Sequence, residues 1–291
     1  MFETVQSKSL TLWRGVLNES FSSPEYTVEE FDRAVLSWNG SGAAFFELEI
    51  GGVRYAMGRS GDDQCSVKCD SVDVDTLVLK TAARSFCFHV TLQPGAKVSL
   101  VAITHWRHGE SSAFSNAPSP AWGKCLTVPE RSQFTEAIDA GRICSPTSVG
   151  MVLAFYGIEK STREVADGVF DHSAKVYGNW ALNTAYAHRV SGLESYVVRT
   201  AGFESIESEI EAGRPVVASL RWKIGELEGA AIAESNGHLV AVCGFTSSGD
   251  VIVNDPAGQP GTVRRIYKRR AFFSAWIKRA SGIIYVFKRT H

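Results

Sequence analysis

Short apolar segments with a two-residue period dominate the first third of the chain. The segments AFFELEI (44–50), SFCFHVTL (85–92) and KVSLVAITH (97–105) alternate or run apolar over a few residues and are bounded by Gly, Asp, Ser or Pro. This period is typical of β-strands, because successive side chains of a strand point to opposite faces of a sheet. We therefore predict an antiparallel β-sandwich or jelly roll before residue 110.

A polar interval rich in Ser and Pro, HGESSAFSNAPSP (108–120), separates this region from a chain of different texture. Such an interval is typical of a linker. Beyond it, helical patterns alternate with strand-like runs such as PVVASL (215–220). The sequence therefore predicts an α+β protein with two domains: an accessory β-domain of residues 1–118 and a second domain of residues 119–291.

The composition argues against several classes of partner. The chain has 291 residues, 44% of them hydrophobic, and a net charge of -1 from 30 basic and 31 acidic residues. Binding a phosphate backbone needs an excess of positive charge, so no nucleic-acid partner is expected. No apolar run approaches the roughly 20 residues of a membrane helix, and MFETVQSKSLTLW (1–13) lacks the basic head and apolar core of a secretion signal. We expect no membrane partner and, as written, a cytoplasmic location, or secretion if a leader was removed.

Cys144 lies at or just before the N-terminus of a predicted helix in GRICSPTSVGMVLAFYG (141–157). Pro146 suits the first turn, and Gly157 is expected to end the helix. Unpaired backbone N–H groups and the macrodipole at a helix start stabilise an anion, which lowers the pKa of a thiol there and favours a nucleophilic thiolate. A buried or helix-capping cysteine is the alternative.

His238 and Asp255 flank a predicted hairpin in NGHLVAVCGFTSSGDVIVND (236–255). His238 opens one strand and Asp255 closes the next, and their spacing allows both side chains to lie on one face. They would be directly opposite if the turn were centred between Thr246 and Ser247. A carboxylate beside a neutral histidine fixes the tautomer of a general base, and such a base would activate a cysteine. A purely structural histidine is the alternative.

Gln133 is a candidate for stabilising the charge of a reaction intermediate. Attack on a carbonyl builds negative charge on oxygen, which needs hydrogen-bond donors placed in advance. The backbone N–H of Cys144 can be one donor, and the side-chain amide of Gln133, in VPERSQF (128–134), could be the other. A solvent-facing loop glutamine is the alternative.

Six motifs beyond the polar interval follow one another in a known order. They are VPERSQ, CSPTSVGMVLAFYG, YGNWALNTAYA, GRPVVASL, NGHLVAVCGF and GDVIVNDPA. In this order they resemble cysteine peptidases similar to the bacteriocin-processing double-glycine peptidases, family 39 of the cysteine type. The resemblance covers residues 126–291, and VLSWNG, VDVDTLVLK and FHVTL resemble the β-rich domain that often precedes this catalytic domain. It implies a papain-like fold for the second domain.

The resemblance also implies a role for each polar candidate. Cys144 would be the nucleophile, His238 the general base and then the general acid, and Asp255 the residue that orients His238. Gln133 would be the oxyanion donor, although it stands eleven residues before Cys144, a longer gap than is usual in papain-like enzymes.

Three further residues are candidates for binding substrate. Trp180 and Asn183 match a family motif before the second helix and could line the cleft beside His238, whereas Trp180 could also be a core aromatic residue. Ser145 stands where many relatives have glycine, and its side chain could narrow the cleft or help to cap the helix.

The sequence thus predicts a cysteine peptidase that hydrolyses peptide bonds through a thioester, without a metal or organic cofactor. Its partner would be a peptide or protein substrate, and the β-domain could bind carbohydrate or protein. The alternatives are an amidase or acyltransferase with the same triad, acting for example on peptidoglycan, and a non-catalytic binding protein on the same scaffold.

Two other patterns are interpreted as structural. The basic cluster RRIYKRR (264–270) is expected to be the solvated edge of a strand. His105 and His108 in HWRH have no carboxylate or thiol nearby, so we expect exposed linker residues rather than metal ligands.

Overall fold

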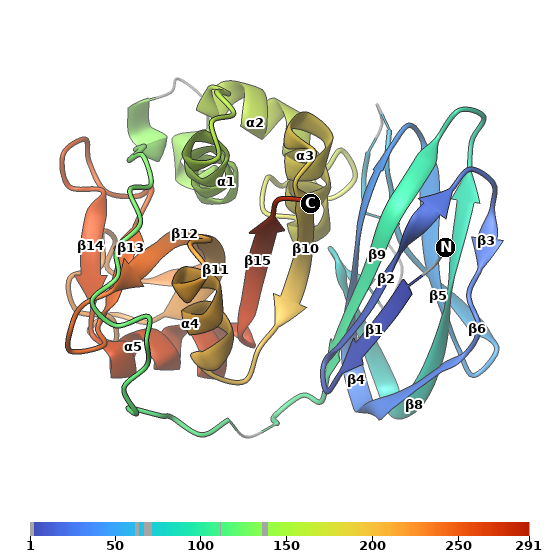
Figure 1. Ribbon diagram of the computed structural model, residues 1–291, viewed down its shortest axis with the longest axis horizontal. Helices are drawn as coiled ribbons and strands as arrows, with labels where there is room; N and C mark the ends of the chain where they lie inside the picture. Colours follow the sequence, from blue (N-terminus) through green and yellow to red (C-terminus); the bar gives the residue numbers. More distant parts are fainter. Residues whose placement is uncertain (1–2, 62–63, 67–71, 111, 136–138, 291) are drawn as a thin grey trace. The chain divides into compact units, whose positions relative to one another are not determined.

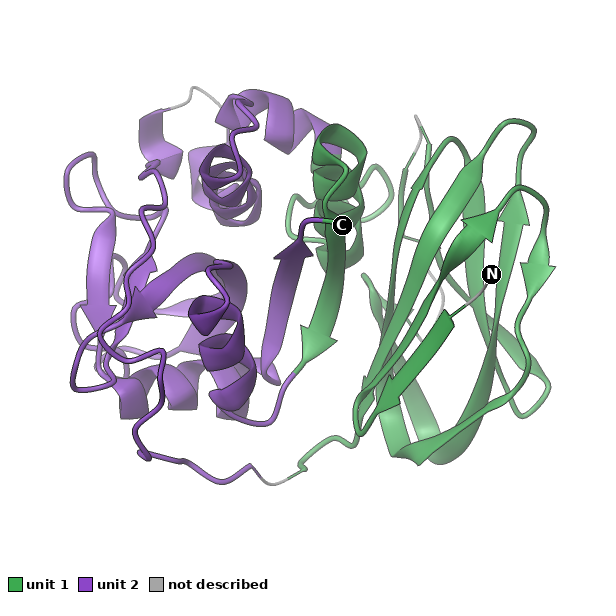
Figure 2. Ribbon diagram, viewed as in Figure 1, with its two compact units in different colours: residues 1–110, 169–199, 290 green, residues 111–168, 200–289, 291 purple. Residues whose placement is uncertain are grey.

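The computed structural model describes residues 3–61, 64–66, 72–110, 112–135 and 139–290. These residues divide into two compact units (Figure 2). Unit 1 contains the described part of 1–110 together with 169–199 and Thr290, and unit 2 contains the described part of 111–168 together with 200–289. A segment from the second half of the chain is therefore part of unit 1. The single boundary between residues 118 and 119 remains a prediction.

Unit 1 is built on antiparallel strands (Figure 1). Its elements are β1 (Glu3–Ser7), β2 (Leu10–Leu17), β3 (Phe21–Ser22), β4 (Tyr26–Ser41), β5 (Ala44–Ile50), β6 (Val53–Arg59), β7 (Val72–Asp73), β8 (Thr76–Leu92), β9 (Lys97–Trp106), α3 (Trp180–Ser191) and β10 (Glu194–Arg199). The first nine strands form a sheet in the order β1-β2-β9-β4-β8-β5-β6, with β3 and β7 also paired to β8. The expected run of antiparallel strands before residue 110 is confirmed.

Alternation along β8 directs one set of side chains into the core of unit 1. Phe86, Phe88 and Val90 are at most 1% exposed, whereas Cys87 on the other face is only half-buried. Phe46 of the neighbouring β5 stacks on Trp38 of β4, with 4.2 Å between the ring centroids. The period-two pattern therefore identified the buried face of these strands correctly.

His105 corrects one of the expectations. It lies within β9, not in an exposed linker, and is 1% exposed against the rings of Phe31 and Phe86. Burial lowers the pKa of His105 to about 4, because an apolar environment disfavours the charged imidazolium. The ring of His105 is thus part of the packed core.

Helix α3 is held at its N-terminal end by two side chains of unit 1 and ends at a glycine. The Asn179 side chain accepts a hydrogen bond from the Leu182 N–H at 3.1 Å, and Asp75 accepts one from the Trp180 N–H at 2.5 Å. Burial raises the pKa of Asp75 to about 7. Gly192, with φ 72°, ends the helix in the left-handed conformation that glycine adopts easily.

Unit 2 combines five antiparallel strands with several helices (Figure 1). Its elements are η1 (Gln133–Thr135), η2 (Ala140–Arg142), α1 (Cys144–Phe155), α2 (Thr162–Val169, except its last residue), α4 (Glu204–Glu211), β11 (Val216–Trp222), β12 (Ser235–Phe245), β13 (Val251–Asn254), β14 (Arg264–Tyr267), α5 (Arg269–Phe273), the π-helical η3 (Ser274–Lys278) and β15 (Ile283–Lys288). Within unit 2 the strands follow the order β15-β11-β12-β13-β14.

Helix α1 is the central helix of unit 2 and packs on β11 and β12. It begins at Cys144, as predicted, and its residues from Ser145 to Leu153 are all buried. Pro146 lies in the first turn, where its missing N–H leaves no gap in the hydrogen bonding. Gly157, with φ 85°, follows the end of the helix, also as predicted. The sequence here specifies both ends of the element.

The basic cluster 264–270 is not simply a solvated strand edge. Arg269 is 3% exposed, pairs with Glu207 at 2.8 Å and lies 3.7 Å from the centre of the Phe203 ring. The indole N–H of Trp122 donates to the same Glu207 carboxylate at 2.9 Å. A buried charge of this kind persists only when it is paired and hydrogen-bonded. Arg269 is therefore part of the interior of unit 2.

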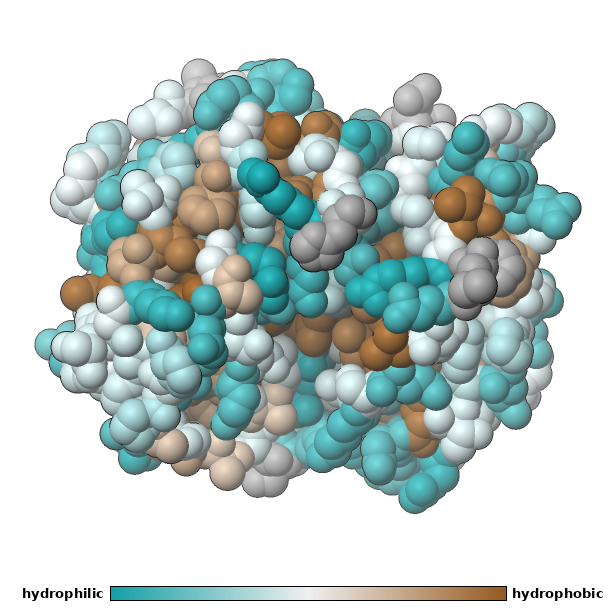
Figure 3. Space-filling model, viewed as in Figure 1, coloured by the Kyte–Doolittle hydropathy of each residue, from teal (hydrophilic) through white to brown (hydrophobic). Residues whose placement is uncertain are grey.

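The remaining surface is mixed in character. Figure 3 shows hydrophilic and hydrophobic residues interspersed over the face in view. None of the helices in the described part of the chain is long and apolar enough to span a bilayer.

The Arg269–Glu207 pair predicts a large loss of stability on removal of one partner. In Glu207→Ala, the buried guanidinium of Arg269 and the indole of Trp122 lose their acceptor, so the free energy of unfolding should fall by about 3–5 kcal/mol. Denaturant unfolding measures this. The control is Lys268→Ala, which breaks the pair of the 72% exposed Lys268 side chain with Asp250 and should lower the free energy of unfolding far less, because water screens an exposed ion pair. An equal fall in the free energy of unfolding in the two variants would contradict a stabilising role for the buried pair.

Candidate active site

His238 and Asp255 meet at one end of the β12–β13 pair. The Nε2 atom of His238 lies 2.7 Å from Oδ1 of Asp255. The residues are not directly opposite: Ala241 pairs with Asn254, so the register places Asp255 across from Val240, and a bulge between Val242 and Gly244 shifts the pairing. The side chains share a face, as predicted, and the imidazole spans the offset of two residues along the strand.

The Asp255 carboxylate has no exposed surface and accepts three hydrogen bonds. The donors are Nε2 of His238 at 2.7 Å, the Ala257 N–H at 2.9 Å and the Tyr267 hydroxyl at 2.5 Å. Burial alone raises the pKa of Asp255, but the imidazole, the hydroxyl and the amide outweigh it, so the pKa lies below its ordinary value. Asp255 is therefore held as a carboxylate.

Cys144 lies near the same imidazole. The His238 ring and the backbone of Leu239 are close enough to the Cys144 thiol to lower its pKa. Because Nε2 faces Asp255, the remaining ring nitrogen, Nδ1, is the one available to the thiol. Burial alone raises the pKa of the Cys144 thiol, but the contact with His238 more than compensates and the pKa lies below its ordinary value.

The pKa of His238 shifts in the opposite direction, upward. Burial lowers the pKa of His238, but the charge and the hydrogen bond of Asp255, with a smaller contribution from Cys144, raise it above its ordinary value. A lowered thiol pKa beside a raised imidazole pKa favours transfer of the thiol proton to the ring. The arrangement therefore favours a thiolate paired with an imidazolium.

Trp222 covers the histidine from the neighbouring strand β11. The two ring centroids are 5.6 Å apart, with planes at 77°. Trp222 is 2% exposed and His238 is 3% exposed. The indole thus keeps water away from the His238–Asp255 hydrogen bond, which strengthens it.

Gln133 begins the short helix η1, and its backbone contacts the segment after Asp255. Its N–H donates to the Pro256 carbonyl at 2.8 Å, and the residue is 4% exposed. Its Oε1 atom is buried and has no hydrogen-bond partner among the described residues. Gln133 is therefore not the solvent-facing residue of the alternative interpretation.

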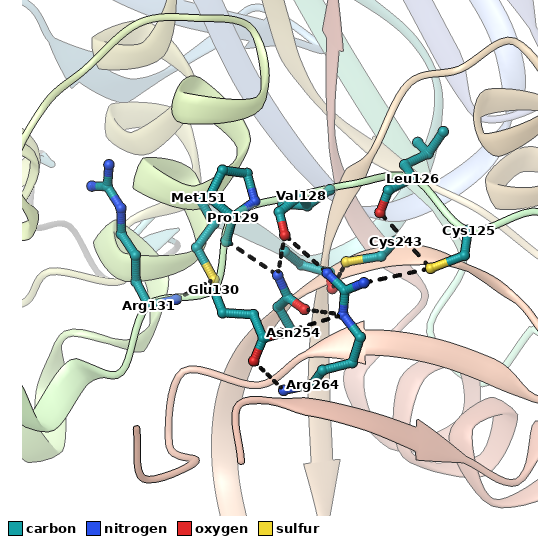
Figure 4. Close-up of polar contacts among 11 residues, drawn as sticks. Cys125, Leu126, Val128, Pro129, Glu130, Arg131, Met151, Cys243, Asn254 and Arg264 are labelled. Carbon is teal, nitrogen blue, oxygen red and sulfur yellow. Dashed lines mark hydrogen bonds and ion pairs between the residues drawn. The ribbon is translucent and has the colours of Figure 1, made fainter. Parts of the chain in front are cut away.

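A polar network connects the segment before Gln133 to strands β13 and β14 (Figure 4). Arg264 donates to the Asn254 side chain and to the Val128 carbonyl, both at 2.9 Å. Asn254 in turn donates to the carbonyls of Val128 and Pro129, at 3.1 and 3.2 Å. Asn254 immediately precedes Asp255, and Pro129 is four residues before Gln133. The network therefore ties the segment leading to Gln133 to the strand that presents Asp255.

A cavity of about 330 Å³ opens next to Gln133. Its lining consists of Glu130, Arg131, Ser132, Thr135, Ser161, Thr162, Pro260, Gly261 and Val263, all in unit 2. The neighbours of Gln133 at positions 132 and 135 thus form part of the wall of this cavity.

The other three predicted site residues lie elsewhere. Ser145 has no exposed surface, and its hydroxyl shares a hydrogen bond with that of Tyr285 at 3.1 Å, so it is a core residue and does not narrow a cleft. Trp180 and Asn183 belong to unit 1. Asn183 is fully buried and donates to the carbonyls of Tyr177 and Asn179, at 2.8 and 2.7 Å.

Two residues of the site were not predicted from the sequence. Tyr267 lies inside the basic cluster RRIYKRR, which was interpreted as a solvated strand edge, so its contact with Asp255 was missed. Trp222 ends a strand-like run and reads as an ordinary core aromatic residue. The two-residue period of a strand places the side chains of Arg265 and Tyr267 on the same face of β14. What that face contacts follows only from the pairing of β14 with β13.

A thiol, an imidazole and a carboxylate in series form the arrangement that proteins use for nucleophilic acyl transfer. Residues 125–283, more than half of the chain, match the sequence model of the Peptidase_C39 like family. The chain belongs to this family, which confirms the resemblance found in the sequence.

Solved structures give more distant similarities. A C39-like peptidase from Bacillus anthracis is 20% identical over 58% of this chain and 99% of its own, with a TM-score of 0.44. A double glycine motif protease from an AMS/PCAT transporter, in complex with the leader peptide, is 24% identical over 58% of this chain and 95% of its own, with a TM-score of 0.39. No curated protein matches the chain significantly.

The opposite pKa shifts of the cysteines predict selective alkylation. At neutral pH, iodoacetamide should label Cys144 at least about tenfold faster than Cys87, whose thiol pKa is raised by burial and by Glu49. Cys243 should react more slowly still, because burial raises its pKa to about 12. The labelling of Cys144 should slow as the pH falls through its depressed pKa, since the thiolate is then protonated. Peptide mass spectrometry after timed quenching measures the rates.

The variant His238→Ala tests the cause of the Cys144 shift. Without the imidazole, burial and the charge of Asp255 both raise the pKa of the thiol and only Leu239 lowers it, so labelling at neutral pH should fall towards the rate of Cys87. Unchanged labelling of Cys144 in this variant would contradict activation by His238.

Proposed function

We propose that this protein is a cysteine peptidase that hydrolyses peptide bonds through Cys144, His238 and Asp255. The observation that carries the proposal is the buried imidazole of His238, which is hydrogen-bonded to the Asp255 carboxylate and lies close enough to the Cys144 thiol to lower the pKa of that thiol. Membership of the Peptidase_C39 like family supports the same class of reaction. A peptide or protein is the substrate that this class of reaction implies.

The reaction follows from the paired shifts of the thiol and the ring. The Cys144 thiolate attacks the amide carbonyl and forms a C–S bond, and the electron pair moves to the carbonyl oxygen. Protonated His238 then gives its proton to the amine nitrogen as the C–N bond breaks, which leaves a thioester. Water attacks the thioester, its proton passes to His238, and the carboxylic acid leaves as the thiolate re-forms.

Two donors are proposed for the oxyanion. The first is the backbone N–H of Cys144, which lies at the start of α1 where helix N–H groups have no intrahelical acceptor. The second is the side-chain amide of Gln133, supported by its burial and by the anchoring of its backbone at Pro256. Donors fixed in this way need no reorganisation when the charge forms.

The finer architecture is also a proposal. We infer that unit 2 has the papain-like arrangement, in which a helix carries the cysteine and a strand pair carries the histidine and its partner. We infer that the sheet of unit 1 is a β-sandwich that binds carbohydrate or protein. Trp180 is retained as a proposed substrate-binding residue, whereas Asn183 is not, because its side chain is fully buried. The cavity lined by Ser132 and Thr135 is proposed as a place for a substrate side chain.

An amidase or acyltransferase is the second candidate, because the same thioester can pass its acyl group to an amine instead of water. Products distinguish the two candidates: hydrolysis yields two free peptide ends, whereas a transferase supplied with hydroxylamine yields a hydroxamate in preference to the acid. A non-catalytic binding protein would yield neither.

The central test is cleavage of a peptide library by the full-length protein. Wild-type protein should release defined products, and Cys144→Ala should lower kcat/KM at least about 1,000-fold, because no other group forms the thioester. The control is Cys87→Ala, a half-buried cysteine of unit 1 that should leave the rate within twofold. If Cys144→Ala made the same products at the wild-type rate, the proposal would fail.

Tyr267 is predicted to be a positioning residue for Asp255. In Tyr267→Phe the carboxylate loses its 2.5 Å donor, so the pKa of Asp255 should rise and the acid limb of the pH–rate profile should move to higher pH. A hydrogen bond to a charged group contributes about 1.5–3 kcal/mol, so kcat should fall at least about tenfold with little change in KM.

Tyr285→Phe is the matched control for that measurement. Tyr285 is also fully buried, and its hydroxyl contacts Ser145 rather than the Asp255 carboxylate. Equal losses in the two variants, with an unchanged pH profile in Tyr267→Phe, would indicate a purely structural role for Tyr267.

A further inference from the structure

A second series of nucleophile, imidazole and carboxylate lies on the outer face of the unit 1 sheet. Oγ of Ser22 is 2.8 Å from Nδ1 of His89, and Nε2 of His89 is 3.0 Å from Oε2 of Glu49. Arg54 also donates to Oε2 of Glu49, at 3.1 Å. All four residues belong to unit 1, so this cluster does not depend on the function proposed for unit 2.

Strand pairing brings the three residues together. Ser22 of β3 is directly across from His89 of β8, and Glu49 of β5 pairs with Cys87, two residues along β8 from His89. His89 is on the face of β8 opposite to the core residues Phe86 and Phe88, so the contacts form on the outer surface of the sheet. The backbone fixes the order of the three side chains.

The hydrogen bonds determine the tautomer of the neutral ring. The pKa of Glu49 lies below its ordinary value, first because of the hydrogen bond from Arg54 and then because of that from His89, which outweigh its desolvation. A carboxylate can only accept, so Nε2 of His89 must donate to it. In the neutral ring, Nδ1 then carries the lone pair and accepts the Ser22 O–H, which is the arrangement of a general base with a serine nucleophile.

The serine of this cluster is accessible to solvent and its histidine is shielded from it. Ser22 is exposed, whereas His89 is buried, with 8% of its surface exposed. The Ser23 N–H donates to the Phe88 carbonyl at 2.9 Å, so by the alternation of antiparallel pairs Ser22 and His89 form a non-hydrogen-bonded pair. Among the described strands β3 pairs only with β8, and the Ser22 N–H therefore points to the open edge, next to its own Oγ.

We propose that Ser22, His89 and Glu49 form a second hydrolytic site, which cleaves short-chain acyl esters presented at the surface of unit 1. The Ser22 N–H is the donor for the oxyanion. Esters are the substrate class because a single donor at an open surface gives limited stabilisation, which is enough for an alkoxide leaving group but not for an amine. A short acyl group fits because the nucleophile lies on an open sheet face.

The chemistry balances with water as the only co-reactant. Oγ of Ser22 bonds to the acyl carbon while its proton moves to Nδ1 of His89. The ester C–O bond then breaks, and His89 returns the proton to the departing alkoxide oxygen. Water attacks the acyl-serine, its proton passes to Nδ1, and the carboxylic acid leaves as the Ser22 hydroxyl re-forms.

The test uses full-length Cys144→Ala protein, so that the thiol of unit 2 cannot contribute. A fluorophosphonate probe should label this protein at Ser22, as located by peptide mass spectrometry, and the protein should hydrolyse p-nitrophenyl acetate. Adding Ser22→Ala should abolish the labelling and lower the hydrolysis at least tenfold. His89→Gln should slow the labelling at least tenfold, and Glu49→Gln should slow it by a smaller factor.

The matched control is Ser85→Ala in the same background. Ser85 lies on β8 and donates to a carboxylate of Glu25 at 2.8 Å, but this hydrogen bond involves no imidazole. It should remain unlabelled, and its replacement should change neither reaction. Labelling of the Cys144→Ala protein at a site other than Ser22, or no faster than in the Ser22→Ala variant, would overturn the proposal. Labelling at Ser22 that His89→Gln leaves unchanged would also overturn it.

Discussion

The hydrogen bond between His238 and Asp255 is the interaction on which the geometry of unit 2 depends. A carboxylate without any exposed surface is strongly destabilising unless donors replace the water that it has lost. Here the donors come from three places in the chain: His238 from β12, Ala257 from the loop after β13, and Tyr267 from β14. The satisfaction of one buried charge therefore fixes the relative positions of three strands, and with them the imidazole that meets Cys144.

The three thiols with shifted pKa values show that the environment of a cysteine, not its residue type, sets the direction of the shift. Cys87 and Cys243 are shifted upward, because burial disfavours the thiolate and little positive charge opposes it. Cys144 experiences the same penalty, but the imidazole that Asp255 keeps basic reverses the direction of the shift. Excluding water from the site thus raises the free energy of the thiolate. It also strengthens the electrostatic interaction with the imidazole that offsets this rise.

Local sequence signals predicted the local parts of this site, and tertiary pairing decided the rest. The start of α1 at Cys144 and the shared face of His238 and Asp255 follow from Pro146, Gly157 and a period of two, all of which act over a few residues. The offset between His238 and Asp255 did not follow, because a bulge beside Gly244 changes the register. Tyr267 was missed because its contact arises only when β14 pairs with β13. Nothing in the sequence signalled that residues 169–199 would join unit 1.

The two histidine relays use the same ring nitrogens but differ in burial, and that difference determines what each can stabilise. In both, Nε2 faces a carboxylate and Nδ1 is left for the nucleophile. His238 is enclosed under Trp222, with its carboxylate fully buried, so an ion pair gains strength from the low dielectric. Glu49 remains partly exposed and shares its oxygen with Arg54, so water screens its effect on His89. The first environment therefore strengthens the interaction between the imidazole and its carboxylate, and the second weakens it.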